Sequence, residues 1–270
     1  MREMTLREVQ MMSLDIAKDI HLFCLKNNIT YYLAYGSLIG ALRHNGFIPW
    51  DDDMDLLMPR PDYERFCREY KSQLGFKLIS RITNKECYVP YARVCEMKKT
   101  YVHEDNIPWC NEDTGVWIDI FPLDGAEEDF DVFKKRVNTI YNLNNYCFKW
   151  RNAKVPLKMV NSIYAKIKLI VKKLLFSYYD PVDKYISILK KVSLGSTSKC
   201  MNLTAPKYKE REYFNISDFN NPVDVVFEGF KFKTMNGYDN FLKSIYGDYM
   251  TIPPAEKQQN HSFYKNYWKE

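Results

Sequence analysis

A cluster of four aspartates is the feature that most constrains how this chain folds. Residues 51–55 read Asp-Asp-Asp-Met-Asp and follow Trp50 directly. Four carboxylates in five positions repel one another, so a folded chain keeps them together only where water or a cation relieves their charge. If a strand begins at Met54, Asp53 and Asp55 point to the same face, because side chains alternate along a strand. Two such carboxylates suit Mg²⁺ or Mn²⁺, which take oxygen ligands and often share them with substrate phosphates.

The same cluster has simpler explanations. Acidic turns are common on protein surfaces, and we expect Asp51 and Asp52 in such a turn, with Asp52 facing away from Asp53 and Asp55. A calcium-binding or adaptor module without catalysis is another alternative. The cluster does not follow the EF-hand pattern, however, and a module of this kind leaves the Asp119 described below without a role.

Gly36 and Ser37 lie shortly before the cluster, at an expected turn from a strand into a helix. Glycine lets the backbone approach a phosphate closely. The first amides of the helix, together with the Ser37 hydroxyl, can donate hydrogen bonds to that phosphate. A phosphate site followed by paired aspartates suits metal-assisted phosphoryl transfer, because the first positions the anion and the metal neutralises the charge that develops.

A third carboxylate is expected from a neighbouring strand. Asp119 interrupts the apolar run Val-Trp-Ile-Asp-Ile-Phe at residues 116–121. A charged residue in such a run is either functional or at a solvated edge of the sheet. We predict that Asp119 joins Asp53 and Asp55 as a catalytic metal ligand. Asp124 follows in an expected loop and is a weaker candidate.

Hydrophobic periodicity predicts an α/β (α+β) fold with one mixed-sheet core and a helical insertion. Thr5 and Glu8 form a capping-box pattern at the start of the first helix. The helices are expected at 5–27, 38–43, 61–74, 127–150, 157–195 and 238–246. The strands are expected at 31–35, 54–58, 76–82, 91–96, 101–104, 116–121 and 223–227.

Composition limits which cellular compartment and which kinds of partner we expect. A net charge of +5 is too mild to argue for nucleic acid. Seven cysteines without a Cys-x-x-Cys pair indicate reduced thiols, and the chain starts without an apolar signal segment, so we expect a cytoplasmic protein. Cys87, Cys95, His103 and Cys110 are close in sequence and could hold zinc, although their spacing matches no common zinc pattern.

The stretch 157–176 is amphipathic and rich in lysine. It contains no acidic residue, and its apolar and basic residues fall on different sides of a helix: Met159, Val160, Ile163, Ile167, Ile170, Val171 and Leu174 on one, and Lys158, Lys166, Lys168, Lys172 and Lys173 on the other. One interpretation is an ordinary surface helix packed on the core. The other is a helix that lies on an anionic membrane. The second would keep a cytoplasmic enzyme peripherally at the inner membrane face, near a lipid-linked glycan acceptor.

Several blocks of sequence resemble the LicD/fukutin family, a branch of the nucleotidyltransferase superfamily. They span most of the chain in the family's order: Tyr-Gly-Ser-Leu-Ile-Gly-Ala-Leu-Arg-His at 35–44, Phe-Ile-Pro-Trp at 47–50 with the aspartate cluster, Trp-Ile-Asp-Ile-Phe-Pro-Leu-Asp at 117–124, and Tyr-Gly-Asp-Tyr at 246–249 followed by Pro253-Pro254. The resemblance implies a nucleotidyltransferase-like catalytic core over 1–125. It leaves 126–198 as the helical insertion and 199–270 as a C-terminal segment that packs on the core and completes the site.

The resemblance also implies an activity. Proteins of this kind transfer phosphocholine, or a similar group, from a CDP-activated donor to a glycan hydroxyl and release CMP. We therefore expect CDP-choline as donor and a teichoic-acid or lipopolysaccharide-type glycan as acceptor. Transfer of ribitol phosphate or glycerol phosphate is an alternative. A glycosyltransferase that holds a nucleotide sugar through a D-x-D motif is another, but only 52 residues precede Asp53 and that scheme gives Gly36 and Ser37 no role.

Further residues are candidates for substrate binding. Arg43 could bind the donor diphosphate, or it could simply interact with the end of its helix. Arg93 is near the proposed site in sequence, although most charges of this kind lie on solvated faces. Choline carries a quaternary ammonium without donor hydrogens, so its recognition relies on aromatic faces. The aromatic candidates are Trp50, Trp109, Trp117 and Tyr249.

Overall fold

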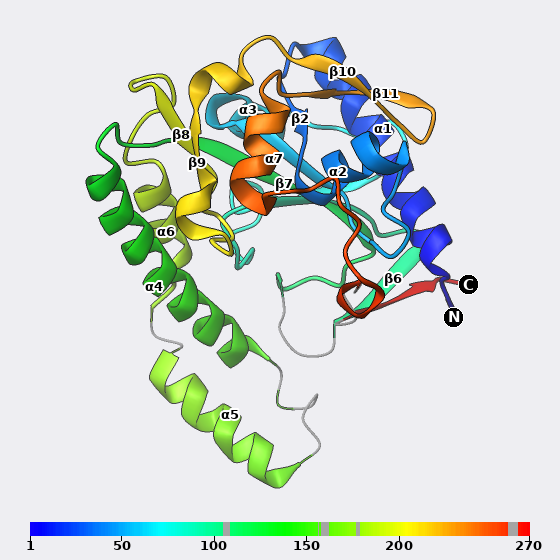
Figure 1. The fold of residues 1–270 in the computed structure, drawn as a ribbon. Coiled ribbons are helices and arrows are strands. Elements are labelled where there is room, and N and C mark those ends of the chain that lie inside the picture. Colours follow the sequence, from blue (N-terminus) through cyan, green and yellow to red (C-terminus); the bar gives the residue numbers. More distant parts are fainter. Residues whose placement is uncertain (105–108, 156, 158–161, 177–178, 259–263) are drawn as a thin grey trace.

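A mixed β-sheet runs through the centre of the molecule, with helices on both faces (Figure 1). The computed structural model describes residues 1–104, 109–155, 157, 162–176, 179–258 and 264–270. The main strands lie in the order β2 (Tyr32–Leu33), β3 (Asp55–Pro59), β7 (Val116–Gly125), β5 (Ala92–Glu96) and β4 (Lys77–Ile79). The α/β fold expected from the sequence is confirmed.

Strands β3 and β7 run parallel, and the other neighbours in this sheet are antiparallel. The far end of β7 pairs with β8 (Lys199–Met201), which pairs in turn with β9 (Tyr213–Asn215). Each strand of the central pair therefore presents alternate residues to two different layers. Leu56 and Met58 of β3 pack in one apolar cluster, and Leu57 packs in another on the opposite face.

The first layer is formed by α1 (Leu6–Asn27) and α3 (Arg60–Glu69). The predicted capping box of α1 is present: the Thr5 hydroxyl accepts from the Glu8 amide, and the Glu8 carboxylate accepts from the Thr5 amide. Ile16 and Ile20 of α1 are completely buried against the sheet. The second layer contains α2 (Tyr35–His44) and α7 (Tyr238–Tyr246), and this is the face on which the candidate site lies.

The segment predicted as a helical insertion contains α4 (Phe130–Lys154), α5 (Ile163–Phe176) and α6 (Val182–Leu189). The single helical region expected over 157–195 is divided, because α6 begins directly after Pro181 and proline cannot continue a preceding helix. Figure 1 shows α5 extending away from the sheet, beside the lower end of α4. The predicted positions Lys158, Met159 and Val160 lie outside the described residues.

Smaller elements complete the fold. The hairpin β10 (Val223–Phe227) and β11 (Phe230–Thr234) packs beside α2, and a second sheet joins β1 (Arg2–Glu3), β12 (Tyr264–Trp268) and β6 (Thr100–Glu104). Short 3₁₀ turns span Lys209–Glu212, Ile216–Phe219 and Ala255–Lys257. In the described part of the chain, every helix is too short or too polar to cross a bilayer.

Candidate functional site

Strand register places three charged residues side by side on the α2 face of the sheet. Asp55 of β3 lies opposite Asp119 of β7, and Arg93 of β5 lies opposite Asp119 on its other side. The Arg93 Nε donates a hydrogen bond to Asp119 Oδ1 at 2.7 Å. The charged residue that interrupts the apolar run of β7 is therefore beside the aspartate cluster, where the sequence predicted a third carboxylate.

The aspartates that precede β3 supply the rest of the charge. Carboxylate oxygens of Asp51, Asp52 and Asp53 lie within 4.8 Å of one another, and these three form a group that could hold a metal ion. The expectation that Asp52 faces away from Asp53 is wrong. Strand β3 begins at Asp55 rather than at Met54, so the alternation of a strand does not extend to Asp52.

The electrostatics of the site favour a bound cation. Burial raises the pKa of Asp55 well above its ordinary value, and the Asp53, Asp119 and Asp51 carboxylates raise it further, whereas Arg93 opposes them. One guanidinium thus faces several carboxylates. All the donors are carboxylate oxygens, which are the ligands that Mg²⁺ and Mn²⁺ prefer. Asp51, Asp52 and Asp53 therefore form a group that fits a divalent cation, whereas ligation by Asp55 and Asp119 stays a prediction.

The predicted zinc ligands do not form a metal-binding group among the described residues. Among the described residues, no group of three or more that includes Cys87, Cys95, His103 or Cys110 has its ligand atoms close enough to share an ion. Cys87 and Cys110 lie opposite each other in an isolated β-bridge. Their sulfurs contact the backbone oxygens of Val89 and Glu112.

The N-terminus of α2 borders the aspartate cluster directly. Ser37 lies in the first turn of α2, and its Oγ accepts a hydrogen bond from the Asp55 amide at 2.9 Å. A Cβ at Gly36 would stand 2.8 Å from Asp51 Oδ2, so glycine is needed there for Asp51 to approach the helix. The positive end of a helix dipole stabilises anions in this position. The predicted phosphate site and the predicted metal site are therefore adjacent.

Tyr35 begins this helix in a strained conformation. Its φ of 51° lies in the left-handed region, which side chains larger than glycine rarely adopt. Its hydroxyl donates to Glu212 Oε2 at 2.9 Å and accepts from Asn202 Nδ2 at 2.7 Å. Burial raises the pKa of Glu212 well above its ordinary value. Sequence reasoning missed Asn202 and Glu212, because the Lys-Glu-Arg-Glu run at 209–212 looks like a solvated segment.

Two tryptophans hold Arg93 in place. The Arg93 guanidinium carbon lies 4.6 Å from the ring centre of Trp109 and 4.1 Å from that of Trp117. The Trp117 ring lies 4.7 Å from the ring of Tyr264. These contacts give both tryptophans a function in positioning Arg93 against Asp119. A role for either ring in choline binding stays a prediction.

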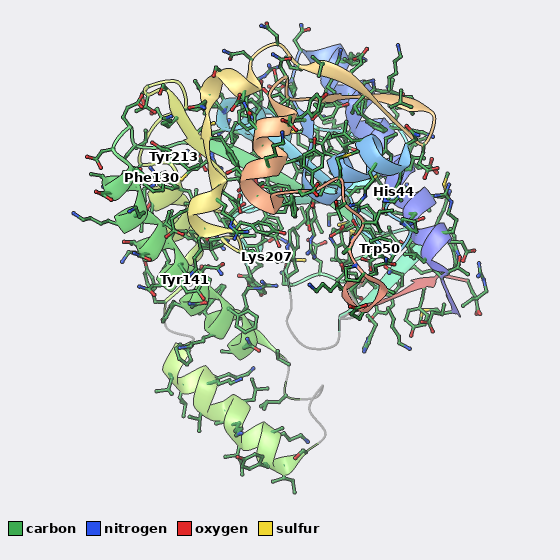
Figure 2. The ribbon with its side chains drawn as sticks, viewed as in Figure 1. His44, Trp50, Phe130, Tyr141, Lys207 and Tyr213 are labelled. Atoms are coloured by element: carbon green, nitrogen blue, oxygen red, sulfur yellow. The ribbon has the colours of Figure 1, made fainter. Side chains whose placement is uncertain are left out.

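Arg43 and Trp50, two further candidates for substrate binding, each contact another part of the chain. Arg43 Nη1 donates to the backbone oxygens of Tyr249, at 2.8 Å, and Thr251, at 3.2 Å. The Trp50 ring lies edge-on to His44, with ring centres 6.3 Å apart (Figure 2). Arg43 thus ties the segment after α7 to α2. Its predicted contact with the donor diphosphate is a separate role that these bonds do not test.

Asp124 belongs to the scaffold. Strand β7 continues to Gly125, so Asp124 lies in a strand and not in the expected loop. Its carboxylate accepts two hydrogen bonds from Arg60, from Nε at 2.7 Å and Nη2 at 2.6 Å. The two side chains are only 1% and 9% exposed. This paired arrangement needs no further ligand.

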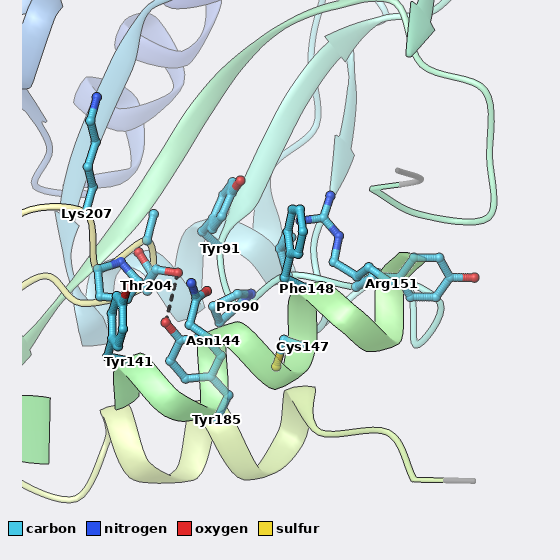
Figure 3. A pocket seen from close by; sticks show the side chains of 14 residues that line it. Pro90, Tyr91, Tyr141, Asn144, Cys147, Phe148, Arg151, Tyr185, Thr204 and Lys207 are labelled. Carbon is cyan, nitrogen blue, oxygen red and sulfur yellow. Dashed lines mark hydrogen bonds between the residues drawn. The ribbon is translucent and has the colours of Figure 1, made fainter. Parts of the chain in front are cut away.

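A pocket of about 290 Å³ opens between α4 and the segments around Tyr91 and Lys207 (Figure 3). Its lining combines aromatic rings, among them Tyr141 and Phe148, with the basic side chains of Arg151 and Lys207, and none of the described residues that line it is acidic. The ring of Tyr91 lies 4.8 Å from that of Phe121 on β7. Burial, followed by the nearby Asp119, raises the pKa of Tyr91. Tyr91 therefore relates the lining of this pocket to the neighbourhood of Asp119.

Comparison with known proteins identifies the family of the chain. Residues 28–165 match the profile described as LicD/FKTN/FKRP, nucleotidyltransferase domain. The whole chain is 30% identical to the lipopolysaccharide cholinephosphotransferase LicD of Haemophilus influenzae, across 99% of both chains. A shorter match to an uncharacterized protein of Rickettsia typhi is 37% identical and covers 30% of this chain and 25% of that protein. The profile match includes the aspartate cluster, Arg93 and Asp119.

Proposed function

Because this chain belongs to the LicD/FKTN/FKRP nucleotidyltransferase-domain family of transferases, we propose that it transfers phosphocholine from CDP-choline to a glycan hydroxyl. The acceptor would be a lipopolysaccharide-type or teichoic-acid-type glycan, and CMP would leave. The observation that carries the proposal is the register of Asp55 against Asp119 beside Asp51–Asp53, within a chain similar over its full length to a cholinephosphotransferase.

In this proposal, Asp53, Asp55 and Asp119 hold Mg²⁺ or Mn²⁺, with Asp51 and Asp52 close enough to contribute. The bound ion would neutralise the charge that develops on the transferred phosphoryl group. Gly36 and Ser37, at the start of α2, bind the donor phosphates through the first amides of the helix. Arg93 orients Asp119 through a hydrogen bond, because its guanidinium is itself fixed between two tryptophan rings.

The transfer forms one bond and breaks one. The oxygen of the acceptor hydroxyl bonds to the distal phosphorus of CDP-choline, and the bond from that phosphorus to the bridging oxygen breaks, so that CMP departs with the bonding electrons. The hydroxyl proton passes to a carboxylate of the cluster, for which Asp119 is our candidate. No covalent intermediate with the protein is needed.

The aromatic pocket beside α4 suits the acceptor better than it suits choline. Arg151 and Lys207 would repel a quaternary ammonium, whereas they attract a sugar that carries phosphate or carboxylate groups. Tyrosine and phenylalanine rings provide flat apolar surfaces against which a sugar ring can pack. Tyr91 connects this pocket to the neighbourhood of Asp119, so an acceptor bound here would have its hydroxyl near the carboxylates.

The test of the reaction is CMP release from CDP-choline by the purified protein with Mg²⁺ and a glycan acceptor. CDP-ethanolamine, CDP-ribitol and CDP-glycerol serve as competing donors. We expect CDP-choline to bind most tightly, because aromatic faces favour the methylated cation over the more strongly hydrated ammonium. Faster turnover of CDP-ribitol or CDP-glycerol would overturn the assignment of phosphocholine but not that of the metal site.

The pocket has its own test. Arg151→Gln and Lys207→Gln should each raise the KM for an anionic acceptor roughly tenfold, which corresponds to about 1.4 kcal/mol, with little change in the KM for CDP-choline. Lys135→Gln, an exposed position on the same helix as Arg151, is the matched control. Unchanged acceptor KM values in both pocket variants would remove the pocket from the acceptor site.

A further inference from the structure

Helix α5 exposes apolar side chains to an extent unlike any other helix of this chain that the structure describes. Of its fourteen residues, Leu169 alone is buried. Ile163 is 77% exposed, Leu175 66% and Leu174 61%. The remaining exposed apolar positions are Tyr164, Ile167, Ile170 and Val171. The interpretation of this segment as an ordinary helix packed on the core does not account for these side chains.

The three kinds of side chain on α5 occupy separate sides of the helix. At 3.6 residues per turn, Leu169 and Phe176 share the side that rests on α4, where the Phe176 ring lies 5.8 Å from that of Tyr146. The exposed apolar residues form a continuous arc on the opposite side. Between the two lie the lysines, with Lys166 and Lys173 on one flank and Lys168 and Lys172 on the other.

This arrangement fits a helix that lies in the plane of a membrane surface. Such a helix turns its apolar arc into the boundary between headgroups and acyl chains, and its flanking lysines extend toward lipid phosphates while their stems stay in apolar surroundings. The stretch 162–176 contains no aspartate or glutamate, so its charge complements an anionic leaflet. Leu157 and Tyr179, a few residues before and after the helix in sequence, are also exposed, at 39% and 51%.

A second copy of this chain is a poorer occupant. In a symmetric dimer the same patch faces itself, so the four lysines of one copy would approach those of the other without any acidic residue on α5 to pair with. We propose that α5 docks this protein on an anionic membrane surface, parallel to the bilayer plane. The docking stands independently of the proposed function. Its purpose rests on that function: α4 carries both α5 and the lining of the aromatic pocket, so docking would hold the pocket beside the headgroups of a lipid-linked acceptor.

The test is sedimentation of the purified protein with vesicles, either pure phosphatidylcholine or phosphatidylcholine with phosphatidylglycerol. We expect binding to the anionic vesicles at low salt, weaker binding at high salt and little binding to the neutral vesicles. Changing Lys166, Lys168, Lys172 and Lys173 to Gln, or Ile167 and Leu174 to Ser, should reduce binding at least fivefold. The matched control changes four exposed lysines elsewhere to Gln: Lys71, Lys98, Lys99 and Lys231.

Three outcomes would overturn the proposal. They are wild-type protein that stays in the supernatant with anionic vesicles at low salt, control and α5 variants that bind equally, and a concentration-dependent dimer that Ile167→Ser with Leu174→Ser abolishes. CMP release with a soluble acceptor separates this result from the proposed reaction. The α5 variants should keep that activity, whereas failure of the wild-type protein to use CDP-choline would count against the reaction and leave the vesicle result intact.

Discussion

Strand β7 carries two aspartate–arginine pairs that differ in their surroundings. Asp124 accepts two hydrogen bonds from Arg60 in a buried, fully paired arrangement, and Arg136 and Lys190 add to the positive potential around it. Asp119 accepts from Arg93, but that one guanidinium also faces the other carboxylates of the aspartate cluster. The same pair of residue types therefore stabilises the fold at one end of the strand and lies beside a group of further carboxylates at the other.

The difference shows how a carboxylate that only stabilises the fold can be distinguished from one that could bind a ligand. Both aspartates interrupt apolar sequence and both contact an arginine, so neither residue type nor the presence of an ion pair separates them. What separates them is the balance of charge around each pair. Arg60 pairs with Asp124 through two hydrogen bonds, and Arg136 and Lys190 add to the positive potential there. Arg93 donates a hydrogen bond to Asp119 and also lies near Asp55, whose pKa the carboxylates of Asp53, Asp119 and Asp51 raise, so a bound cation would suit this end of the strand.

The largest effect on turnover should come from removing a carboxylate charge in the aspartate cluster. Asp53→Asn and Asp55→Asn should each lower kcat at least about a hundredfold, because each removes a ligand of the ion that neutralises the transferring group. The melting temperature of Asp55→Asn should stay the same or rise, since the folded protein already disfavours the ionised form of Asp55. CMP release and thermal denaturation measure the two effects. Near-normal turnover at saturating Mg²⁺ would remove either residue from the site.

The two pairs can be compared directly by Asp124→Ala and Asp119→Ala. Asp124→Ala leaves the buried Arg60 uncompensated and should cost about 3–5 kcal/mol in the free energy of unfolding. Asp119→Ala should lower kcat by orders of magnitude with a much smaller loss of stability and less effect on donor binding. Denaturant unfolding and steady-state kinetics on both variants make the comparison. The reverse pattern, with Asp119→Ala the less stable and still active, would show that Asp119 is the structural partner.

Metal addition offers a test that does not depend on turnover. A ligand that binds the native state raises its stability by about 2.7 kcal/mol at one hundred times its Kd. Mg²⁺ or Mn²⁺ should therefore raise the melting temperature of the wild-type protein, and chelation should reverse the rise. Asp55→Asn should lose most of this response, whereas Arg43→Gln, outside the carboxylate cluster, should retain it. A rise in melting temperature for Asp55→Asn equal to that of the wild-type protein would show that the ion binds elsewhere.

A third acid–arginine pair is exposed at the start of α1, and we expect the smallest effects from substitutions there. Arg2, together with the cap at Thr5, lowers the pKa of Glu8 from 4.5 to about 2. The stabilisation from Glu8 is thus present above about pH 4.5 and is lost as the pH falls through 2. Thr5→Ala, which removes the cap, should cost about 1 kcal/mol at neutral pH. Denaturant unfolding of Thr5→Ala and Glu8→Gln across this pH range provides the measurement. A Glu8→Gln deficit that persists at pH 2 would contradict the linkage.

The sequence predicted the elements that have strong local signals. The capping box of α1, the strands of the central pair and the helix α7 were expected, because each has regular periodicity or a clear terminal residue. Strands β8, β9 and β12 were not expected. β8 and β9 are only three residues long, and their positions depend on pairing with distant segments. The alternating Phe-Lys-Phe-Lys of β11 was a usable signal that sequence reasoning overlooked.

Sequence reasoning likewise identified some residues of the candidate site and missed others. The sequence was enough to nominate Asp53 and Asp55 from the acidic run and Asp119 from the apolar run of a neighbouring strand, although their role as ligands stays a prediction. The position of Asp52 was wrong because it depended on the first residue of β3, and strand ends are set by pairing rather than by local sequence. The partners of Arg93 and Tyr35 were out of reach for another reason. Arg93 contacts Trp109, and Tyr35 contacts Asn202 and Glu212, only through tertiary contacts between distant segments.

The close approach of Asp51 to Gly36 has a thermodynamic consequence. Asp51 lies at the positive end of α2, where an anionic ligand would also bind, and it belongs to the group of carboxylates that could hold a metal ion. An ion that draws Asp51 toward itself removes a competing negative charge from the helix end. The affinity for a phosphate there then rises, and by reciprocity the phosphate strengthens the binding of the ion by the same factor. We therefore expect donor and metal to bind with positive cooperativity, so that neither alone saturates the protein at the concentrations at which the two together do.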